Sequence, residues 1–227
     1  MSGQGRTIPL WKKTFDVALA TVLLLVAALP ICILAIWVYL SMGRPVFFRQ
    51  VRPGLNGALF GLVKFRTMTN ERGEDGELLP DAARLTRAGR FLRATSLDEL
   101  PELWNILKGE MSFVGPRPLL PAYLPYYLPE QARRHEVLPG LTGLAQVSGR
   151  NAQTWEARFR HDVEYVDTLS FWGDMKILAR TAWTVLRRDG VNAEGHETMP
   201  RFDEMVKAGT TRGRLPDRQE SASEEAI

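Results

Sequence analysis

The longest run of apolar positions in the chain lies near the N-terminus, where no residue between Asp16 and Arg44 carries a charge. A run of more than about 20 apolar residues is long enough to form a membrane helix. It is about twice as long as the apolar part of a cleavable signal peptide, and no small-residue cleavage site follows it. The pattern therefore predicts that residues 1–44 form a basic N-terminus and a retained membrane helix.

Basic residues flank this run on both sides. The positive-inside rule would keep both ends on the cytoplasmic side, which a straight membrane-crossing helix cannot do. Pro30 lies near the middle of the run and predicts a kink, because it removes one helical hydrogen bond. A re-entrant helix that enters and leaves the same leaflet fits both features, and a tilted helix that crosses the membrane is the alternative. The flanking residues are Arg6, Lys12 and Lys13 before the run, and Arg44, Arg49 and Arg52 after it.

Shorter patterns follow the membrane run. The apolar and aromatic stretches VFFRQV and LFGLVKF are joined by RPGLNG, a combination that predicts a β-hairpin. Residues 69–83 are polar and contain glycine, as expected of a loop that orders over a ligand. The next stretch, from Arg84 to Gly109, predicts two helices interrupted around residues 94–96. We expect an α+β fold that is mostly helical, with this small hairpin.

Composition and charge narrow the possible partners. With 227 residues, of which 45% are hydrophobic, the chain can form a core, so we assign residues 45–208 to one compact domain. Residues 209–227 are too polar to pack, and we predict that this tail is disordered. The single cysteine, Cys32, favours a cytosolic location. The net charge of +3 is modest, and basic residues beside apolar segments indicate anionic lipid or phosphate as partner and not nucleic acid.

The stretch TSLDELPELWN places two adjacent carboxylates, Asp98 and Glu99, at the expected start of a helix. Ser96 and Glu99 have the spacing of a capping box, which would give Glu99 a structural role. That interpretation leaves Asp98 unexplained. The alternative is chemical: one carboxylate attacks an electrophile while the other holds a divalent cation.

Several stretches in order make a family resemblance specific. KFRTM, TSLDELPELWNILKGEMSFVGPRP, LPGLTGLAQVSGRN and DVEYVDTLSFWGDMKIL follow the basic and apolar N-terminus. Together they resemble the bacterial sugar transferase family, the monotopic phosphoglycosyl transferases, from about Lys12 to Phe202. The chain resembles the small members, and RRDGVNAEGHETMPRF near its end is similar to the branch that serves protein glycosylation or surface polysaccharide assembly.

The resemblance implies a reaction and a set of site residues. Family members transfer a sugar-1-phosphate from a UDP-sugar to polyprenyl phosphate at the inner (cytoplasmic) membrane, using Mg²⁺ and releasing UMP. By match to the motif, Asp98 would be the nucleophile that carries the phosphosugar, and Asp98 and Glu99 would hold the metal. The expected phosphate-binding and substrate-binding residues are Lys64, Arg66, Arg93, Arg117, Pro118 and Arg150.

Two other functions remain open from the residues alone. In a membrane-anchored scaffold, the acidic pair would only cap a helix and the basic residues would bind lipid headgroups. A metal-dependent hydrolase would cleave UDP-sugar without a lipid acceptor. The three histidines have no metal-ligand spacing, so we expect none of them to hold a metal.

Overall fold

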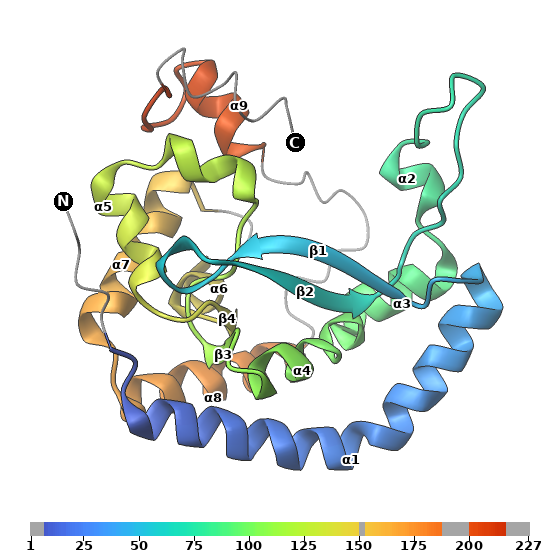
Figure 1. Ribbon diagram of the computed structural model, residues 1–227, viewed down its shortest axis with the longest axis horizontal. Coiled ribbons are helices and arrows are strands. Elements are labelled where there is room, and N and C mark those ends of the chain that lie inside the picture. Colours follow the sequence, from blue (N-terminus) through green and yellow to red (C-terminus); the bar gives the residue numbers. More distant parts are fainter. Residues whose placement is uncertain (1–6, 150–152, 188–199, 217–227) are drawn as a thin grey trace.

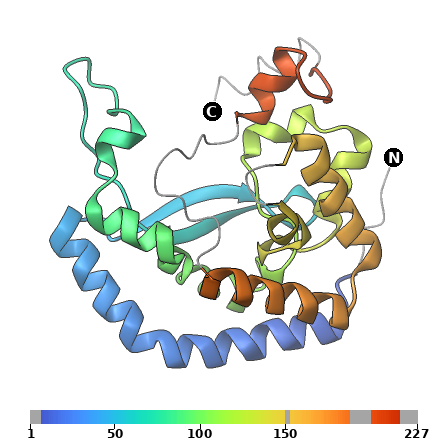
Figure 2. The same cartoon turned by 180° about the vertical axis from the view of Figure 1, so that it is seen from behind.

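The computed structural model describes residues 7–149, 153–187 and 200–216. Helix α1 (Leu10–Met42) contains Pro30 and bends as it passes along one side of the domain (Figures 1 and 2). It is the one helix in the described part of the chain that is long and apolar enough to cross a membrane. Its outer face is apolar and exposed: Leu25, Val26, Leu29 and Leu40 are each at least 70% exposed.

Both ends of α1 are bound to the same domain. Near the N-terminal end, Lys12 Nζ lies 2.6 Å from Asp174 Oδ2, and both side chains are buried. At the C-terminal end, Arg66 donates hydrogen bonds to the carbonyl oxygens of Met42 and Arg44. Lys12 therefore does not face lipid headgroups as a flanking charge would, because it is fully buried against helix α8 (Phe171–Arg187).

The predicted hairpin is confirmed. Strands β1 (Phe47–Pro53) and β2 (Leu59–Phe65) pair in antiparallel register, with Phe47 opposite Phe65. The connecting turn places Asn56 and Gly57 at φ 53° and 77°, which suits the asparagine and glycine found there. Figure 1 shows the hairpin lying across the domain, with helix α4 (Glu102–Leu107) between the hairpin and α1.

The segment after the hairpin forms an arm that extends from the body of the molecule in both ribbon views (Figures 1 and 2). It returns through helix α2 (Asp81–Arg84) to helix α3 (Arg87–Thr95). Helix α3 ends at Ser96, which has a left-handed backbone conformation with φ 56°. A 3₁₀ turn over Leu97–Glu99 then leads into α4. The predicted interruption between the two helices is therefore confirmed.

The remaining chain is mostly helical, as expected, with one sheet that the hydrophobic pattern did not predict. Strand β3 (Ser112–Val114) pairs in parallel with β4 (Gly140–Thr142). Such short strands leave no periodic signal, because each contributes only three residues. The other helices are α5 (Pro129–Ala132), α6 (Leu144–Gly149), α7 (Trp155–Thr168) and α9 (Phe202–Lys207).

Three buried clusters hold the fold together, one of which packs Leu34 and Val38 of α1 against Phe65 of β2 and Leu92 of α3. Two more involve the elements that follow. The first of these joins α1, α4, β3, α7 and α8 through residues such as Ile106, Met111 and Val166, each 0% exposed. The second is aromatic and docks α9 onto α7, with Phe202 packed against Phe159 at a ring-centroid distance of 4.9 Å. Burial of these apolar surfaces supplies the main favourable free energy of folding.

The first part of the predicted disordered tail follows a defined path. The Arg214 N–H donates to the Tyr126 carbonyl at 2.8 Å, and Gln131 Nε2 donates to the Arg212 carbonyl at 3.0 Å. Residues 209–216 thus depart from the prediction, because their backbone groups find partners on the 3₁₀ turn over Pro121–Tyr126 and on α5. Residues 217–227 lie outside the described part of the chain.

Candidate active site

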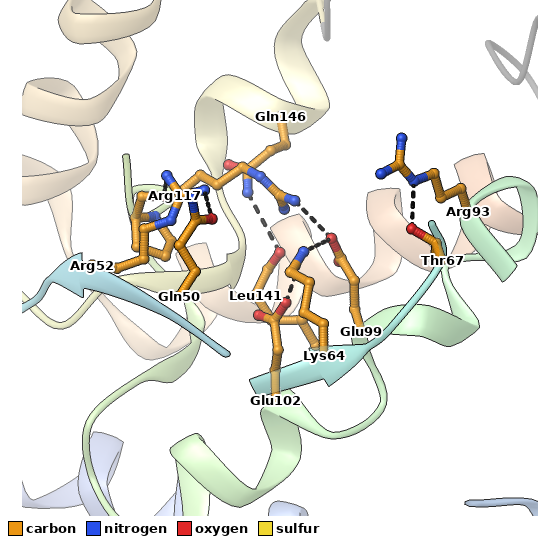
Figure 3. A network of polar contacts seen from close by, with 11 residues as sticks. Gln50, Arg52, Lys64, Thr67, Arg93, Glu99, Glu102, Arg117, Leu141 and Gln146 are labelled. Carbon is orange, nitrogen blue, oxygen red and sulfur yellow. Dashed lines mark hydrogen bonds and ion pairs between the residues drawn. The ribbon is translucent and has the colours of Figure 1, made fainter. Parts of the chain in front are cut away.

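A polar cleft of about 540 Å³ opens between the hairpin, α3 and the 3₁₀ turn at Leu97–Glu99. We call it the polar cleft. The structure brings six of the predicted site residues to its lining: Lys64, Arg66, Arg93, Asp98, Glu99 and Arg117. Figure 3 shows Lys64, Glu99 and Arg117 converging, with Arg93 on the other side of Glu99.

Glu99 is held by two cations. Its Oε1 accepts hydrogen bonds from Lys64 Nζ at 2.7 Å and from Arg117 Nη2 at 2.6 Å (Figure 3). Burial alone would raise the pKa of Glu99, but the charges of Arg117 and Lys64 outweigh it and lower the pKa to about 2. The Glu99 carboxylate is therefore ionised at any physiological pH.

The capping-box interpretation of this pair is wrong. The Ser96 side chain makes no capping hydrogen bond, and the Ser96 N–H donates to the Arg93 carbonyl. The Glu99 side chain turns away from Ser96 toward the basic residues of the polar cleft. The reason is electrostatic, since two cations attract a carboxylate more strongly than one neutral backbone N–H.

Asp98 lies in the opposite environment. Burial raises its pKa above the ordinary 3.8, the charge of Glu99 raises it further, and Lys64, Arg93 and Arg117 oppose both effects. Within the described residues, no hydrogen bond or ion pair occupies the Asp98 carboxylate. It lines the polar cleft as a carboxylate available to a ligand.

Sequence reasoning missed two residues that position Lys64. Glu102 is 2% exposed, and its Oε1 lies 3.0 Å from Lys64 Nζ, so Lys64 bridges Glu99 and Glu102 (Figure 3). Asn105 accepts from the Val63 N–H at 3.1 Å and donates to the Gly61 carbonyl at 2.8 Å, which ties β2 to α4. The sequence did contain a signal for them. Glu102 and Asn105 are polar, yet they lie on the side of α4 that its apolar neighbours direct inward.

The position of Arg117 depends on two glycines. A Cβ on Gly115 would lie 2.3 Å from the Leu138 carbonyl oxygen, and one on Gly140 would lie 2.1 Å from the Gly115 nitrogen. The GPRP and LPGLTG segments, which continue the parallel pairing of β3 and β4, therefore lie side by side in backbone contact. The glycine-rich stretch thus approaches the segment that carries Arg117.

Pro118 takes part in the site through its backbone carbonyl group, and its side chain does not line the polar cleft. It is buried, and its carbonyl accepts from Arg52 Nη1 at 3.4 Å. Arg52 also lines the polar cleft, although the sequence marked it only as a flanking charge. Burial and the nearby Arg117 lower the pKa of Arg52, so this side of the cleft is strongly cationic.

The other predicted arginines differ from one another. Arg93 donates through Nε to Thr67 Oγ1 at 3.0 Å and extends its guanidinium toward the side where Glu99 lies (Figure 3). Arg66 is 6% exposed and, although it lines the polar cleft, its guanidinium donates to the carbonyl groups of Met42 and Arg44 at the end of α1. Arg150 lies outside the described residues.

The donor set fits Mg²⁺ through two carboxylates. The described residues contain no group of three or more His, Cys, Asp or Glu side chains able to hold a metal. Mg²⁺ commonly binds one or two carboxylates and takes its remaining ligands from water and substrate phosphates. Among the described residues, both contacts of Glu99 use Oε1, so Oε2 of Glu99 and both oxygens of Asp98 are open to that role.

The two histidines in the described part of the chain do not line the polar cleft. His135 is partly buried against the Gly54 carbonyl at 3.3 Å, and burial lowers its pKa to about 4. His161 Nδ1 lies 3.3 Å from Glu164 Oε2 at the surface. His196 lies outside the described residues.

Comparison with known proteins identifies relatives over most of the chain. Residues 7–188 match the bacterial sugar transferase family. The chain is 54% identical to the uncharacterized sugar transferase EpsL of Bacillus subtilis, over 84% of this chain and 95% of that protein. It is 43% identical to the UDP-glucose:undecaprenyl-phosphate glucose-1-phosphate transferase of Caulobacter vibrioides, over 80% of this chain and 72% of that protein. It is 39% identical to the undecaprenyl-phosphate galactose phosphotransferase of Salmonella typhimurium, over 79% of this chain and 41% of that protein.

Proposed function

The chain belongs to the bacterial sugar transferase family, and from that premise we propose that it transfers a sugar-1-phosphate from a UDP-sugar to undecaprenyl phosphate. The products are undecaprenyl-diphosphate-sugar and UMP. The observation that carries this proposal is the acidic pair in the polar cleft. A carboxylate with a raised pKa, Asp98, stands beside one that two cations keep ionised, Glu99.

The proposed reaction has two displacements at phosphorus. A carboxylate oxygen of Asp98 attacks the β-phosphorus of the UDP-sugar, and the bond to the bridging oxygen breaks as UMP leaves with that oxygen. The product is a phosphosugar bound to Asp98. An oxygen of undecaprenyl phosphate then attacks the same phosphorus, and the Asp98 carboxylate is released. Neither step needs an added oxidant or reductant.

The basic residues fit the charge that this reaction develops. Arg93 and Arg117 offer forked donors to phosphate oxygens, and Lys64 offers a single concentrated charge. Asp98 and Glu99 would hold Mg²⁺, which neutralises diphosphate charge when bound so that an anionic nucleophile can approach. Glu99 also fixes Lys64 and Arg117 at the cleft before substrate binds.

The membrane association of the protein follows from α1. Both of its ends are anchored to one domain, and this supports a re-entrant helix whose outer apolar face lies in the cytoplasmic leaflet. A helix that crossed the bilayer with Lys12 on the far side would have to break the buried Lys12–Asp174 ion pair. Exposed aromatic side chains on neighbouring helices are suited to the membrane interface: Phe91 on α3, Trp104 on α4, and Trp172 and Trp183 on α8.

The deciding experiment measures UMP release by the purified protein from UDP-glucose, UDP-galactose and UDP-N-acetylglucosamine, with and without undecaprenyl phosphate. A transferase releases at most one equivalent of UMP without the lipid and turns over repeatedly with it. Repeated turnover without lipid would identify a hydrolase. No UMP release from any UDP-sugar would favour a scaffold and contradict the proposal.

A further inference from the structure

A second cavity, of about 700 Å³, meets the polar cleft from the side of α1. We call it the α1 cavity. The two share four lining residues, Arg93, Ser96, Glu99 and Arg117, so Glu99 of the acidic pair lies where they join and Asp98 lies next to it in the chain. The lining of the α1 cavity also includes apolar residues, among them Leu23, Val26 and Ala27 of α1 and Leu178 of α8. The α1 cavity thus combines arginines with an apolar wall.

Arg158 on α7 lines the α1 cavity and has no role in the mechanism above. Within the described residues, no carboxylate lies in hydrogen-bond or ion-pair contact with it. Its guanidinium packs over the Trp155 ring with 5.0 Å between the guanidinium carbon and the ring centroid. A partly buried guanidinium without an anion is costly unless a ligand supplies the anion.

The carboxylates around the α1 cavity are already neutralised. Asp162 Oδ2 accepts from Arg134 Nε at 3.0 Å and from Arg134 Nη2 at 2.8 Å, and both side chains are 2% exposed. Glu99 is paired with Lys64 and Arg117. Burial lowers the pKa of Arg158, Asp162 partly opposes this, and the charges of Arg134 and Arg117 lower the pKa further. The lining of the α1 cavity therefore carries surplus positive charge, with Arg93, Arg117, Arg134 and Arg158 against Glu99 and Asp162.

We propose that the α1 cavity is the acceptor site, in which Arg158 binds the phosphate of undecaprenyl phosphate and the first isoprene units lie against α1 and α8. This inference rests on the proposed function. A soluble UDP-sugar matches the polar cleft, whereas a ligand with one phosphate and an apolar chain matches the arginines and the apolar residues that together line the α1 cavity. Val26 is 72% exposed, so the chain leaves the cavity along the apolar face of α1.

The geometry gives each substrate its own route to Asp98. The donor enters through the polar cleft, and the acceptor phosphate arrives from the α1 cavity beside the shared residues Arg93 and Arg117. A cavity of this size holds a phosphate and a short apolar segment, in the range of ordinary ligand pockets. The remainder of the polyprenyl chain then lies in the leaflet with α1.

The first test compares Arg158→Gln with Arg160→Gln, an exposed arginine on the same helix. Loss of a charged hydrogen bond to phosphate should raise the KM for undecaprenyl phosphate at least about 10-fold in Arg158→Gln. The KM for the UDP-sugar should stay within about twofold, and Arg158→Lys should recover part of the loss. Arg160→Gln should match the wild type. An unchanged acceptor KM in Arg158→Gln, or an equal rise for both substrates, overturns the assignment.

The second test does not depend on turnover or on a variant that folds. Wild-type protein is irradiated with a farnesyl phosphate that carries a benzophenone, in the absence of UDP-sugar. Labelled peptides should map to residues 23–27 of α1, to α6 or to α8, and excess undecaprenyl phosphate should prevent labelling whereas undecaprenol should not. Labelling elsewhere, or equal competition by phosphatidylglycerol, overturns the acceptor site. Failure of the proposed function would instead appear as wild-type protein that releases no UMP.

Discussion

Asp98 and Glu99 are neighbours in the chain, yet their carboxylates lie in opposite electrostatic environments. Glu99 accepts hydrogen bonds from Lys64 and Arg117, which hold its pKa at about 2 against the effect of burial. Asp98 is partly buried without a hydrogen-bond donor among the described residues, and its pKa is raised. Adjacent acids whose pKa values are driven apart are typical of two residues with different roles.

The first prediction concerns Asp98→Asn. The raised pKa means that the folded protein disfavours ionised Asp98, a penalty that is absent below pH 3.8 and complete above the folded pKa. Removing this charge should therefore leave Tm at pH 7 equal to or above that of the wild type. Turnover should vanish, because an amide does not form the acyl-phosphate intermediate. Radiolabelled UDP-sugar without lipid should label the wild type and not the variant; a labelled or active Asp98→Asn protein would remove Asp98 from the nucleophile role.

Glu99→Gln should behave differently. Lys64 and Arg117 would lose their shared anion, so the free energy of unfolding should fall by about 1–3 kcal/mol at pH 7. Because the folded pKa is about 2 and the ordinary value is 4.5, Glu99 contributes this stability above pH 4.5 and loses it as pH falls through about 2. The difference in Tm between wild type and variant should shrink accordingly in acid. A difference that grows in acid would contradict the ion-pair assignment.

At the scale of the elements, two buried contacts decide where α1 and Arg117 lie. The Lys12–Asp174 pair fastens the first turn of α1 to α8, and the Tyr165 hydroxyl donates to the same Asp174 at 2.8 Å. The contact of Gly115 with Gly140 fixes the GPRP segment. Each contact joins segments that are distant in the chain. Because each depends on one pair of residues, a single substitution can break it.

The third prediction tests the anchor of α1. Lys12→Met would leave the Asp174 carboxylate buried without its cation, which typically costs about 3–5 kcal/mol. We expect a lower Tm and a lower yield of folded protein when the variant is extracted from membranes with detergent. Adding Asp174→Asn should restore most of the loss, because the amide keeps a partner for Tyr165 and carries no charge. A single variant as stable as the wild type would show that the ion pair does not anchor the helix.

The fourth prediction tests the glycine contact. Gly140→Ala places a methyl group 2.1 Å from the Gly115 nitrogen, so the two segments must separate. Overpacking of this kind costs about 1–3 kcal/mol or more, and activity should fall further than stability because Arg117 moves. Gly61→Ala in β2 is the matched control, since its Cβ would meet nothing within 4 Å. Equal activity of the two variants would exclude this contact as a determinant of the site.

At the scale of the whole molecule, α1 determines which side of the membrane holds the active site. The fifth prediction uses cysteine labelling in intact cells, in a Cys32→Ser background because Cys32 is exposed. Gly3→Cys and Glu74→Cys should both react only with a membrane-permeant reagent, since a re-entrant helix keeps both positions in the cytoplasm. Reaction of position 3 with an impermeant reagent would mean that α1 crosses the bilayer.

The sequence by itself determined the features that depend on neighbours in the chain. The apolar run with Pro30 predicted a long helix, RPGLNG predicted the hairpin turn, and the break at Ser96 followed from the pattern around it. The motifs also brought Asp98, Glu99, Lys64, Arg93 and Arg117 together as a candidate site, and all five line the polar cleft. Local backbone preference and periodic burial carry this information, so it is present in short stretches.

Only the tertiary structure decided which partner each charge takes. Lys12 pairs with a residue 162 positions away, and Arg66 donates to a carbonyl group at the end of α1. Glu99 binds two cations where the spacing alone suggested a capping box. The glycines of LPGLTG meet GPRP, and Arg158 reaches the α1 cavity, through packing that no local pattern encodes. The physical reason is that the strength of a charge interaction depends on burial and on distance in space, and both are set only when distant segments pack.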